Sequence, residues 1–356
     1  MTKKEKALIA MSGGVDSAVA AFLLKENYNL TGITMCLWDN EKKVPEEFDC
    51  QPDINAAEAK KTADLLEFPH LTVALGNSFY ECVVRRFIDD YQSGKTPNPC
   101  VECNKKIKFG KLFDIAKQLE IPFLATGHYA NIEKLSNGDY VLKKAADASK
   151  DQSYFLWSIK KELLPHILFP LGNYTKSAIR EIAEDNNFSN AHRSDSQDIC
   201  FIPDGDYISF LRKYGEPKFK KGNFVDLNGN IIGQHQGLER YTIGQRKGLG
   251  VAFGKPMFVA EKNVDKNTVT LCSDSELYRT ELTANTLNFL VNDTLETKTR
   301  LSAKIRYRHS PATATVQRTD VDTLSVVFDE PQRAITSGQS LVLYDGDTVI
   351  GGGIIK

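Results

Sequence analysis

Hydrophobic and polar positions follow two alternating patterns from the start of the chain to about residue 200. Short apolar runs predict β-strands at residues 7–11, 30–35, 71–75 and 122–126. Between them, apolar residues recur at helical spacing in residues 17–25, 53–66 and 78–91, and a further helix is predicted just after Cys103. Strands that alternate with helices are typical of a parallel sheet, so we expect an α/β fold with a doubly wound sheet.

The pattern changes after about residue 205. Asn137-Gly138 predicts a hairpin over residues 131–144, and a short helix over 206–214 precedes a second hairpin around Asn228-Gly229. Beyond residue 275 only short alternating runs remain, at 302–307, 313–317, 323–328 and 340–343, and they predict a β-barrel or sandwich. We therefore expect three domains: residues 1–205, a small central α+β domain over 206–274, and a C-terminal β-barrel over 275–356.

Composition narrows the class of protein without naming a partner. The 356 residues are 41% hydrophobic and 26% charged, which argues against a disordered chain. Lysine and arginine total 45 against 46 acidic residues, so the net charge of -1 excludes a polybasic protein. Seven irregularly spaced cysteines fit a reducing compartment in which thiols serve chemistry rather than structure. No apolar run suits a membrane span or a signal peptide, so we expect a cytoplasmic protein.

One short string predicts an anion site between the first strand and the first helix. Ser12-Gly13-Gly14-Val15-Asp16-Ser17 combines two glycines, which let the backbone approach an anion, with free amides at a helix N-terminus. It is neither a GxxxxGK[ST] loop nor a GxGxxG turn. The alternative is an ordinary glycine-rich connection, but the serines and the aspartate at this place favour anion binding.

Three cysteines are candidates for chemistry. Cys100 and Cys103 lie at the start of a predicted helix, where the dipole and nearby lysines are expected to lower the thiol pKa. A closed zinc site is disfavoured, since no second CxxC or close histidine pair follows. Cys200 taken alone is more typical of buried packing, and its neighbours Asp195, Asp198 and Asp204 would raise its pKa.

Together these strings resemble one family, the tRNA-specific 2-thiouridylases, which belong to the PP-loop ATP pyrophosphatases. The matching strings are residues 12–17, 96–104, 126–129, 150–154, 194–201 and 241–248. The resemblance implies an ATP-dependent tRNA sulfurtransferase that adenylates the wobble uridine, replaces its C2 oxygen with sulfur, and releases AMP and pyrophosphate. It also implies that a cysteine desulfurase or sulfur-relay protein donates a persulfide, and that the substrates are the tRNAs for Lys, Glu and Gln. We expect a monomer.

The resemblance assigns roles to individual residues. Cys200 would carry the persulfide, and Cys103 would be the nucleophile that ends in a disulfide with it. Cys100 stands where many relatives carry aspartate, so either Cys100 transfers protons or another group does. A third possibility is that Cys100, Cys103 and Cys200 hold an iron–sulfur cluster. ATP would bind Ala10, Met11, Ser12, Gly13, Gly14, Val15, Asp16, Ser17, Met35 and Gly127, with Mg²⁺ near Asp16. The target base would meet Asn98, Pro99 and Cys100, and tRNA would meet His128, Lys150, Asp151, Gln152, Arg306, Tyr307 and Gln339.

A basic segment in the C-terminal region offers a surface for RNA. No acidic residue occurs between Lys298 and Arg318. If residues 301–307 form a strand, Arg300, Lys304, Arg306 and Arg308 share one face and Tyr307 faces the core. The alternative is an ordinary solvated strand face. Contact between tRNA and Tyr307 then requires a bulge or a backbone interaction.

Two other functions remain open from the sequence. A PP-loop amidotransferase or ligase would use the same loop but needs no paired thiols. An RNA-binding protein with ATP as a switch would form no adenylated intermediate.

Overall fold

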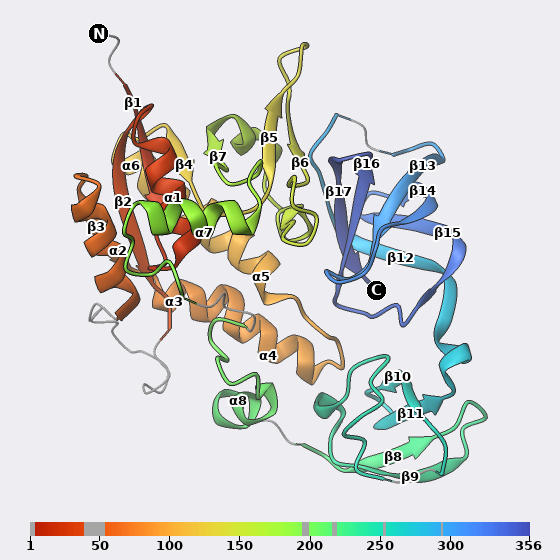
Figure 1. The fold of residues 1–356 in the computed structure, drawn as a ribbon. Coiled ribbons are helices and arrows are strands. Elements are labelled where there is room, and N and C mark those ends of the chain that lie inside the picture. Colours follow the sequence, from red (N-terminus) through yellow and green to blue (C-terminus); the bar gives the residue numbers. More distant parts are fainter. Residues whose placement is uncertain (1–3, 39–53, 194–198, 216–218, 252–253, 293–294) are drawn as a thin grey trace. The chain divides into compact units, whose positions relative to one another are not determined.

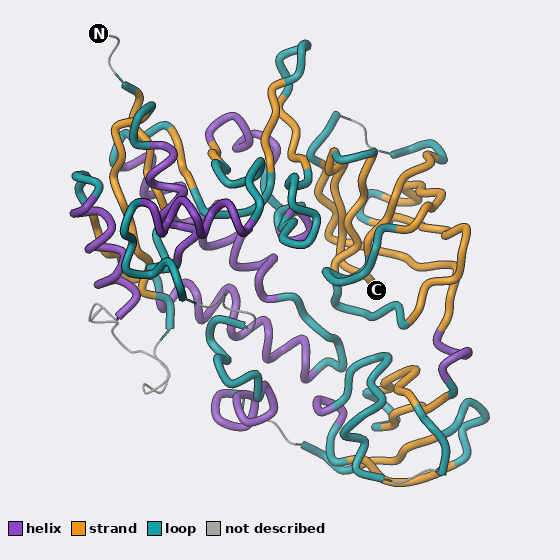
Figure 2. Tube along the Cα trace, in the orientation of Figure 1, coloured by secondary structure: helices purple, strands orange, loops and turns teal. Residues whose placement is uncertain are grey.

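A computed structural model describes residues 4–38, 54–193, 199–215, 219–251, 254–292 and 295–356. The chain forms two compact units. Unit 1 comprises Met1–Val83, Cys100–Phe201 and Gly346–Ile350, and unit 2 comprises Val84–Pro99, Ile202–Asp345 and Gly351–Lys356. Helices alternate with strands in unit 1, whereas strands dominate the later part of unit 2 (Figure 2).

The described residues of unit 1 form a five-stranded parallel sheet in the order β3-β2-β1-β4-β7 (Figure 1). The strands are β1 Glu5–Ala10, β2 Tyr28–Cys36, β3 His70–Ala74, β4 Phe123–Ala125 and β7 Ile167–Leu168. Ala7 and Ile9 pack with α1 (Val15–Leu24), α2 (Ile54–Leu65) and α7 (Lys176–Asp185), and Leu8 between them is also fully buried. Side chains alternate between the faces of a strand, so both faces are covered. The predicted doubly wound α/β fold is confirmed.

The remaining helices differ in detail from the prediction. They are α3 Gly76–Phe79, the π-helix η1 Tyr80–Val84, α4 Arg85–Gln92, α5 Pro99–Glu102, the π-helix η2 Cys103–Lys111, α6 Leu112–Gln118, and the 3₁₀ turns η3 Ser153–Phe155 and η4 Lys161–His166. The prediction that a helix begins after Cys103 was wrong, because the helix begins at Pro99 and contains both thiols. Proline suits the first helical position, where its missing N–H is not needed.

A β-hairpin follows the fourth strand of the sheet. Its strands are β5 Asn131–Lys134 and β6 Tyr140–Lys143, joined by a turn in which Gly138 has a φ of 89°. Lys143 also pairs with Thr348, at the start of β17 (Thr348–Ile355). The predicted hairpin around Asn137-Gly138 is confirmed.

The central part of unit 2 holds a short helix and a small sheet. α8 (Tyr207–Tyr214) begins at Asp206, whose side chain accepts a hydrogen bond from the Ser209 N–H at 3.0 Å. The sheet has the order β10-β11-β8-β9, from β8 Gly222–Val225, β9 Ile231–His235, β10 Phe258–Asn263 and β11 Thr268–Cys272, with a 3₁₀ turn η5 at Leu238–Arg240. Phe224, Tyr241 and Val259 are among its core residues. The predicted α+β character is confirmed.

The last part of unit 2 closes into a barrel. Its described strands are β12 Tyr278–Phe289, β13 Thr299–Lys304, β14 Ala312–Asp320, β15 Thr323–Arg333, β16 Ser340–Asp345 and β17, preceded by the 3₁₀ turn η6 Asp274–Leu277. They follow the order β12-β15-β14-β13-β16-β17, and β12 pairs with β17 to close the ring. Closure leaves no open edge. The barrel prediction is confirmed, but β13 ends at Lys304, so the strand predicted to reach residue 307 is shorter.

Candidate functional site: a phosphate loop and three thiols

The loop between β1 and α1 is held in one shape by its own hydrogen bonds. The Ser17 hydroxyl accepts from the Ser12 N–H at 3.2 Å and donates to the Gly14 carbonyl at 2.9 Å. Gly13 has a φ of 71°, and a Cβ there would lie 2.4 Å from the Asn55 carbonyl oxygen. The loop therefore requires glycine, and α1 begins without a side-chain cap. Its first amides are available to bind an anion.

The residues predicted to bind nucleotide gather at the carboxyl end of the sheet. Ala10 ends β1, Met35 is the penultimate residue of β2, and Gly127 follows β4. A Cβ at Gly127 would lie 3.0 Å from the Ser17 nitrogen, so this glycine lets two loops approach closely. Ligands of doubly wound sheets bind at this end. The individual nucleotide contacts stay predictions.

Asp16 is fixed by two residues that sequence reasoning did not select. Its Oδ1 accepts hydrogen bonds from the Tyr129 hydroxyl at 2.6 Å and the Lys176 Nζ at 2.7 Å. Tyr129 is held in turn by Gln152, whose side-chain oxygen accepts from the Tyr129 N–H at 3.0 Å. Tyr129 lies in the matched string 126–129, but nothing in the local sequence around Lys176 connects it with the loop.

A second pair of missed residues binds the Gly13 carbonyl. Asn190 Nδ2 donates to it at 3.0 Å, and Arg193 Nη1 lies 3.5 Å away. Arg193 also donates to the Asn55 side-chain oxygen at 2.8 Å. The buried Asn190 Oδ1 accepts no hydrogen bond within the described part of the chain. Lys176 and Arg193 thus bring two positive charges to the loop that was predicted to bind phosphate.

The three candidate thiols belong to unit 1. Cys103 is buried in the first turn of η2, whereas Cys100 and Cys200 are exposed. Cys200 is followed by the buried Phe201, whose ring lies 5.6 Å from that of Phe79. This aromatic contact anchors the Cys200 segment. All three thiols are free, so the predicted Cys103–Cys200 disulfide is not present in this state. Cys36 is disulfide-bonded, contrary to the expectation that the cysteines serve chemistry alone.

The prediction that the helix start and nearby lysines lower the thiol pKa values was wrong in net effect. Desolvation raises the pKa of Cys103 to about 12 and that of Cys200 to about 11, and it also raises the pKa of Cys100. Neighbouring thiols add to the rise for Cys103 and Cys200, while the charge of Lys108 lowers the pKa of each of the three. These mutual effects show that Cys100, Cys103 and Cys200 are electrostatic neighbours.

His128 is buried, and both of its ring nitrogens are engaged inside unit 1. Nδ1 is hydrogen-bonded to the Thr126 hydroxyl, and Nε2 lies 3.2 Å from Lys108 Nζ. Desolvation, followed by the charge of Lys108, holds the pKa of His128 well below its usual value. The ring is therefore neutral and accepts the lysine's hydrogen bond. Its contact with tRNA stays a prediction.

The segment Lys150 to Gln152 is likewise used within the protein. Asp151 is buried and accepts hydrogen bonds from the Ala145 N–H at 3.1 Å and the Ser153 hydroxyl at 2.8 Å. The Gln152 side chain positions Tyr129, as described above. Lys150 lies in a turn in which its N–H donates a hydrogen bond to the Asp147 carbonyl. These contacts support the loop around Asp16. The tRNA contacts implied for this segment are untested.

The basic face predicted around β13 is partly neutralised. Arg300 donates to Asp329 on β15 at 2.6 Å. Arg306 lies beyond the end of the strand and donates to the carbonyls of Ile243 and Ala334, each at 2.9 Å, as well as to the Thr336 hydroxyl. Tyr307 is half-buried, with Lys304 Nζ 5.5 Å from its ring centre. Of the predicted cluster, Arg308 is the exposed arginine that makes no described hydrogen bond or ion pair.

Gln339 joins the barrel to the segment that precedes the first thiols in the chain. Its Nε2 donates to the carbonyls of Thr96 at 2.8 Å and Pro97 at 3.3 Å. The Thr96 N–H donates to the Ser337 carbonyl at 2.9 Å. All of these residues belong to unit 2. In this state Gln339 therefore positions the chain leading to Asn98 and Pro99, the predicted target-base residues.

The side chains that could bind a metal ion differ between the thiol cluster and the phosphate loop. No group of three His, Cys, Asp or Glu residues in the described ranges is placed to hold a metal ion. Cys100, Cys103 and Cys200 therefore do not fit an iron–sulfur cluster as arranged. Asp16 differs, because only its Oδ1 is used by Tyr129 and Lys176. One carboxylate suits Mg²⁺, which takes most of its ligands from water and nucleotide phosphates.

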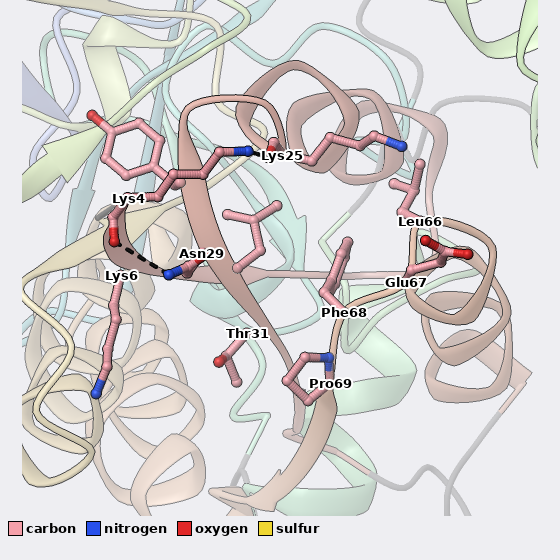
Figure 3. A pocket seen from close by; sticks show the side chains of 11 residues that line it. Lys4, Lys6, Lys25, Asn29, Thr31, Leu66, Glu67, Phe68 and Pro69 are labelled. Carbon is pink, nitrogen blue, oxygen red and sulfur yellow. Dashed lines mark hydrogen bonds between the residues drawn. The ribbon is translucent and has the colours of Figure 1, made fainter. Parts of the chain in front are cut away.

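A basic pocket of about 430 Å³ lies at the opposite end of the sheet (Figure 3). It is lined by Lys4, Lys6, Lys25, Tyr28, Asn29, Leu30, Thr31, Leu66, Glu67, Phe68 and Pro69. These residues surround the amino ends of β1 and β2, where Asn29 donates to the Lys4 carbonyl at 3.2 Å. The pocket is therefore not part of the nucleotide site.

Comparison with known proteins decides the family. Over 100% of this chain and 99% of its own length, the tRNA-specific 2-thiouridylase MnmA of Clostridioides difficile is 47% identical. This chain belongs to the tRNA-specific 2-thiouridylase family. A second member, from Clostridium botulinum strain Alaska E43, is 45% identical over 99% of this chain and 98% of its own.

Profiles of known domains cover this 2-thiouridylase family member along its length. A tRNA methyl transferase HUP domain matches residues 5–204, a tRNA methyl transferase PRC-barrel domain 208–273, and an aminomethyltransferase beta-barrel domain 279–355. A solved structure of a predicted tRNA methyltransferase subunit from Methanocaldococcus jannaschii covers 51% of this chain and 74% of its own, at 19% identity. Its TM-score of 0.32 is too low to inform the fold. Within the described residues, no helix has the length and apolarity to span a membrane.

Proposed function

We propose that this protein is an ATP-dependent tRNA sulfurtransferase that forms 2-thiouridine at the wobble position. One observation carries the proposal: a phosphate loop and three neighbouring thiols lie in the same α/β unit of a 2-thiouridylase family member. The amidotransferase or ligase alternative explains the loop but gives the clustered thiols no task. The RNA-binding switch explains neither the thiols nor an ATP-splitting loop.

The first half-reaction takes place at the phosphate loop. The free amides of α1 bind the phosphates, and Lys176 and Arg193 offset their negative charge. The uridine O2 attacks the α-phosphorus of ATP, and pyrophosphate leaves. Asp16 would hold Mg²⁺, which supplies charge neutralisation on the phosphates when bound. Adenylation converts a poor oxygen leaving group into AMP, so that C2 becomes open to a sulfur nucleophile.

The second half-reaction uses the thiols. Cys200, exposed at the surface, receives a persulfide from a sulfur donor. Its terminal sulfur attacks C2 and displaces AMP, which leaves the uridine joined to Cys200 through a disulfide. The Cys103 thiolate then attacks the Cys200 sulfur, releases 2-thiouridine, and forms the Cys103–Cys200 disulfide. A reductant must restore both thiols before the next turnover.

Cys100 is proposed as an assisting thiol rather than a cluster ligand. Its exposed side chain interacts electrostatically with Cys200 and Cys103. The chain has cysteine where many relatives carry aspartate. Although the residue is exposed at the surface, neighbouring atoms desolvate its thiol and so raise the pKa of Cys100. In its neutral form this thiol is a proton donor, so it is suited to protonate the departing AMP oxygen.

The partners follow from the same proposal. We propose that the substrates are the tRNAs for Lys, Glu and Gln, that a cysteine desulfurase or relay protein supplies sulfur, and that the enzyme works in the cytoplasm with them. We also propose domain limits of 1–205, 206–274 and 275–356, which agree within a few residues with the ranges that the three domain profiles match.

Nucleoside mass spectrometry of tRNA from cells that lack this protein tests the function. We expect loss of 2-thiouridine derivatives while 4-thiouridine is unchanged. Retention of 2-thiouridine would contradict the proposal. With purified protein, pyrophosphate release should depend on substrate tRNA, which separates the enzyme from an ATP-switched binding protein.

Cysteine variants test the sulfur step. Cys103→Ser and Cys200→Ser should each lower 2-thiouridine formation by at least about a thousandfold, because each removes a sulfur atom that the transfer requires. ATP binding should change less than about threefold. Cys272→Ser is the matched control, because Cys272 lies on β11 of the central sheet. Full activity in either of the first two variants would contradict the thiol mechanism.

A further inference from the structure

Lys108 lies five residues after Cys103 in the π-helix η2. In an α-helix with 3.6 residues per turn, that spacing rotates a side chain by roughly 140°, toward the other side of the helix. In a π-helix, hydrogen bonds join residues five apart, as the Leu112 N–H does with the Ile107 carbonyl. The widened turn therefore brings Lys108 toward the face that carries Cys103.

The Lys108 ammonium is held in place by His128. Nζ donates to the neutral His128 Nε2 at 3.2 Å, and the histidine ring is fixed by its Nδ1 bond to Thr126. The ring also packs against Phe109 at 6.0 Å and Phe169 at 5.7 Å. Because the neutral ring leaves the positive charge of Lys108 uncompensated, that charge remains available to act on an anion nearby.

The pKa values of the three thiols are all influenced by the same charged side chain. The charge of Lys108 lowers the pKa of Cys100, Cys103 and Cys200, while Cys100 raises the pKa of the other two thiols. For Cys200, backbone hydrogen bonds lower the pKa in the same direction as Lys108. Without Lys108, desolvation would oppose the thiolates of Cys100 and Cys103 more strongly.

We infer that Lys108, positioned by His128, is the cation that stabilises the thiolates of Cys103 and Cys200 during sulfur transfer. The lysine acts through its charge and takes part in no proton transfer. The inference rests on the proposed function only for this catalytic consequence. The effect of the Lys108 charge on the thiols requires neither tRNA nor ATP.

The first test follows alkylation of the reduced full-length protein by iodoacetamide across pH 7 to 10, with peptide mass spectrometry. In Lys108→Met the Cys200 and Cys100 thiols should react about tenfold more slowly at a given pH, which corresponds to a rise of about one pKa unit. Lys108→Arg should restore the rate to within about threefold of wild type. Cys82, a free cysteine on the π-helix η1 outside the thiol cluster, is the internal standard in the same sample.

Two further variants keep this test sharp. Lys117→Met on α6 removes a lysine outside the thiol cluster and should leave the alkylation profile unchanged. His128→Phe keeps Lys108 and fills the aromatic pocket, so it should fold even where Lys108→Met does not. It should slow alkylation of Cys200 by about threefold. Equal Cys200-to-Cys82 rate ratios in wild type, Lys108→Met and His128→Phe would overturn the inference.

Single-turnover thiolation gives the catalytic readout. Between pH 7 and 9, Lys108→Met should form 2-thiouridine about tenfold more slowly than wild type, and raising the pH should recover part of the rate. Adenylation, followed as pyrophosphate release, should be unchanged. Wild-type rates of thiolation in Lys108→Met would overturn the catalytic role. Failure of the wild-type protein to make 2-thiouridine would instead contradict the proposed function and leave the alkylation result standing.

Discussion

The phosphate loop and the basic segment around β13 both look like ligand sites in the sequence, but they differ in how their charged groups are used. At the loop, Asp16, Lys176 and Arg193 converge on one short turn whose helix amides are uncapped. Around β13, Arg300 pairs with Asp329 and Arg306 binds backbone carbonyls. Charged side chains of both regions are bonded within the protein, but the loop also presents uncapped helix amides to a ligand, whereas the segment around β13 relies on side chains alone.

A local sequence pattern predicts a backbone site more reliably than it predicts a charged surface. A loop between a strand and a helix presents the backbone itself, and the glycines that shape it are adjacent in sequence. A strand presents side chains whose neighbours come from other strands, which the local sequence does not name. Asp329 neutralises Arg300 although it lies outside the acid-free stretch from 298 to 318.

Among changes within these two regions, Asp16→Asn should have the largest effect. The change removes the carboxylate charge that orders Lys176 and that we assign to Mg²⁺, so tRNA-dependent pyrophosphate release should fall about a hundredfold, or roughly 2.7 kcal/mol. The affinity for tRNA should change less than threefold, as measured by filter binding. Asp185→Asn, on α7, is the control. Equal loss of both properties would remove the contrast between the two regions.

Arg306→Ala should act chiefly on stability. The side chain bonds to carbonyls of Ile243 and Ala334, and the loss of charged hydrogen bonds should lower the free energy of unfolding by about 2 kcal/mol. Chemical denaturation monitored by fluorescence measures this change. Unchanged stability together with a salt dependence of tRNA binding that falls by one phosphate contact would show that Arg306 is a tRNA ligand. It would contradict a structural role for this arginine.

Lys176→Met should produce an intermediate loss. Without the ammonium, Asp16 keeps only the Tyr129 hydroxyl at its Oδ1, and the loop loses one positive charge. We expect pyrophosphate release to fall about tenfold, mainly through a higher KM for ATP, because the lysine acts on bound phosphate. Lys160→Met, on a residue next to the turn η4, controls for charge removal. A fall in kcat alone would place Lys176 in the chemistry instead.

The smallest effect separates two arginines of the basic segment. Arg308→Ala should weaken tRNA binding a few-fold and lower the salt slope by about one phosphate contact, because its charge is exposed and uncommitted. Arg300→Ala should change the slope by less, since Asp329 already offsets the charge, and should cost under about 1 kcal/mol of stability. Titrations at several salt concentrations decide between them, and identical slopes would contradict the distinction.

Much of the fold was predictable because its signals are local. The apolar runs correctly predicted β1 to β4, and the turn at Asn137-Gly138 predicted the β5–β6 hairpin. The loss of helical periodicity after residue 275 predicted the barrel. The start of the thiol helix was missed because Pro99 at a first helical position resembles the loop prolines around it. The π-helix after Cys103 was also missed, because a 3.6-residue period is the pattern for which helices are searched.

The backbone part of the site can be predicted from the amino-acid sequence: a glycine-shaped loop after β1, a helix behind it, and thiols at residues 100, 103 and 200. The side chains that complete the site depend on how the chain folds in three dimensions. Lys176, Asn190 and Arg193 reach the loop from more than a hundred residues away in the chain. The same holds for thiol acidity, which a helix dipole and lysines were predicted to increase. For Cys103, desolvation outweighs the charge of Lys108, because burial penalises a thiolate more than this partly exposed lysine can offset.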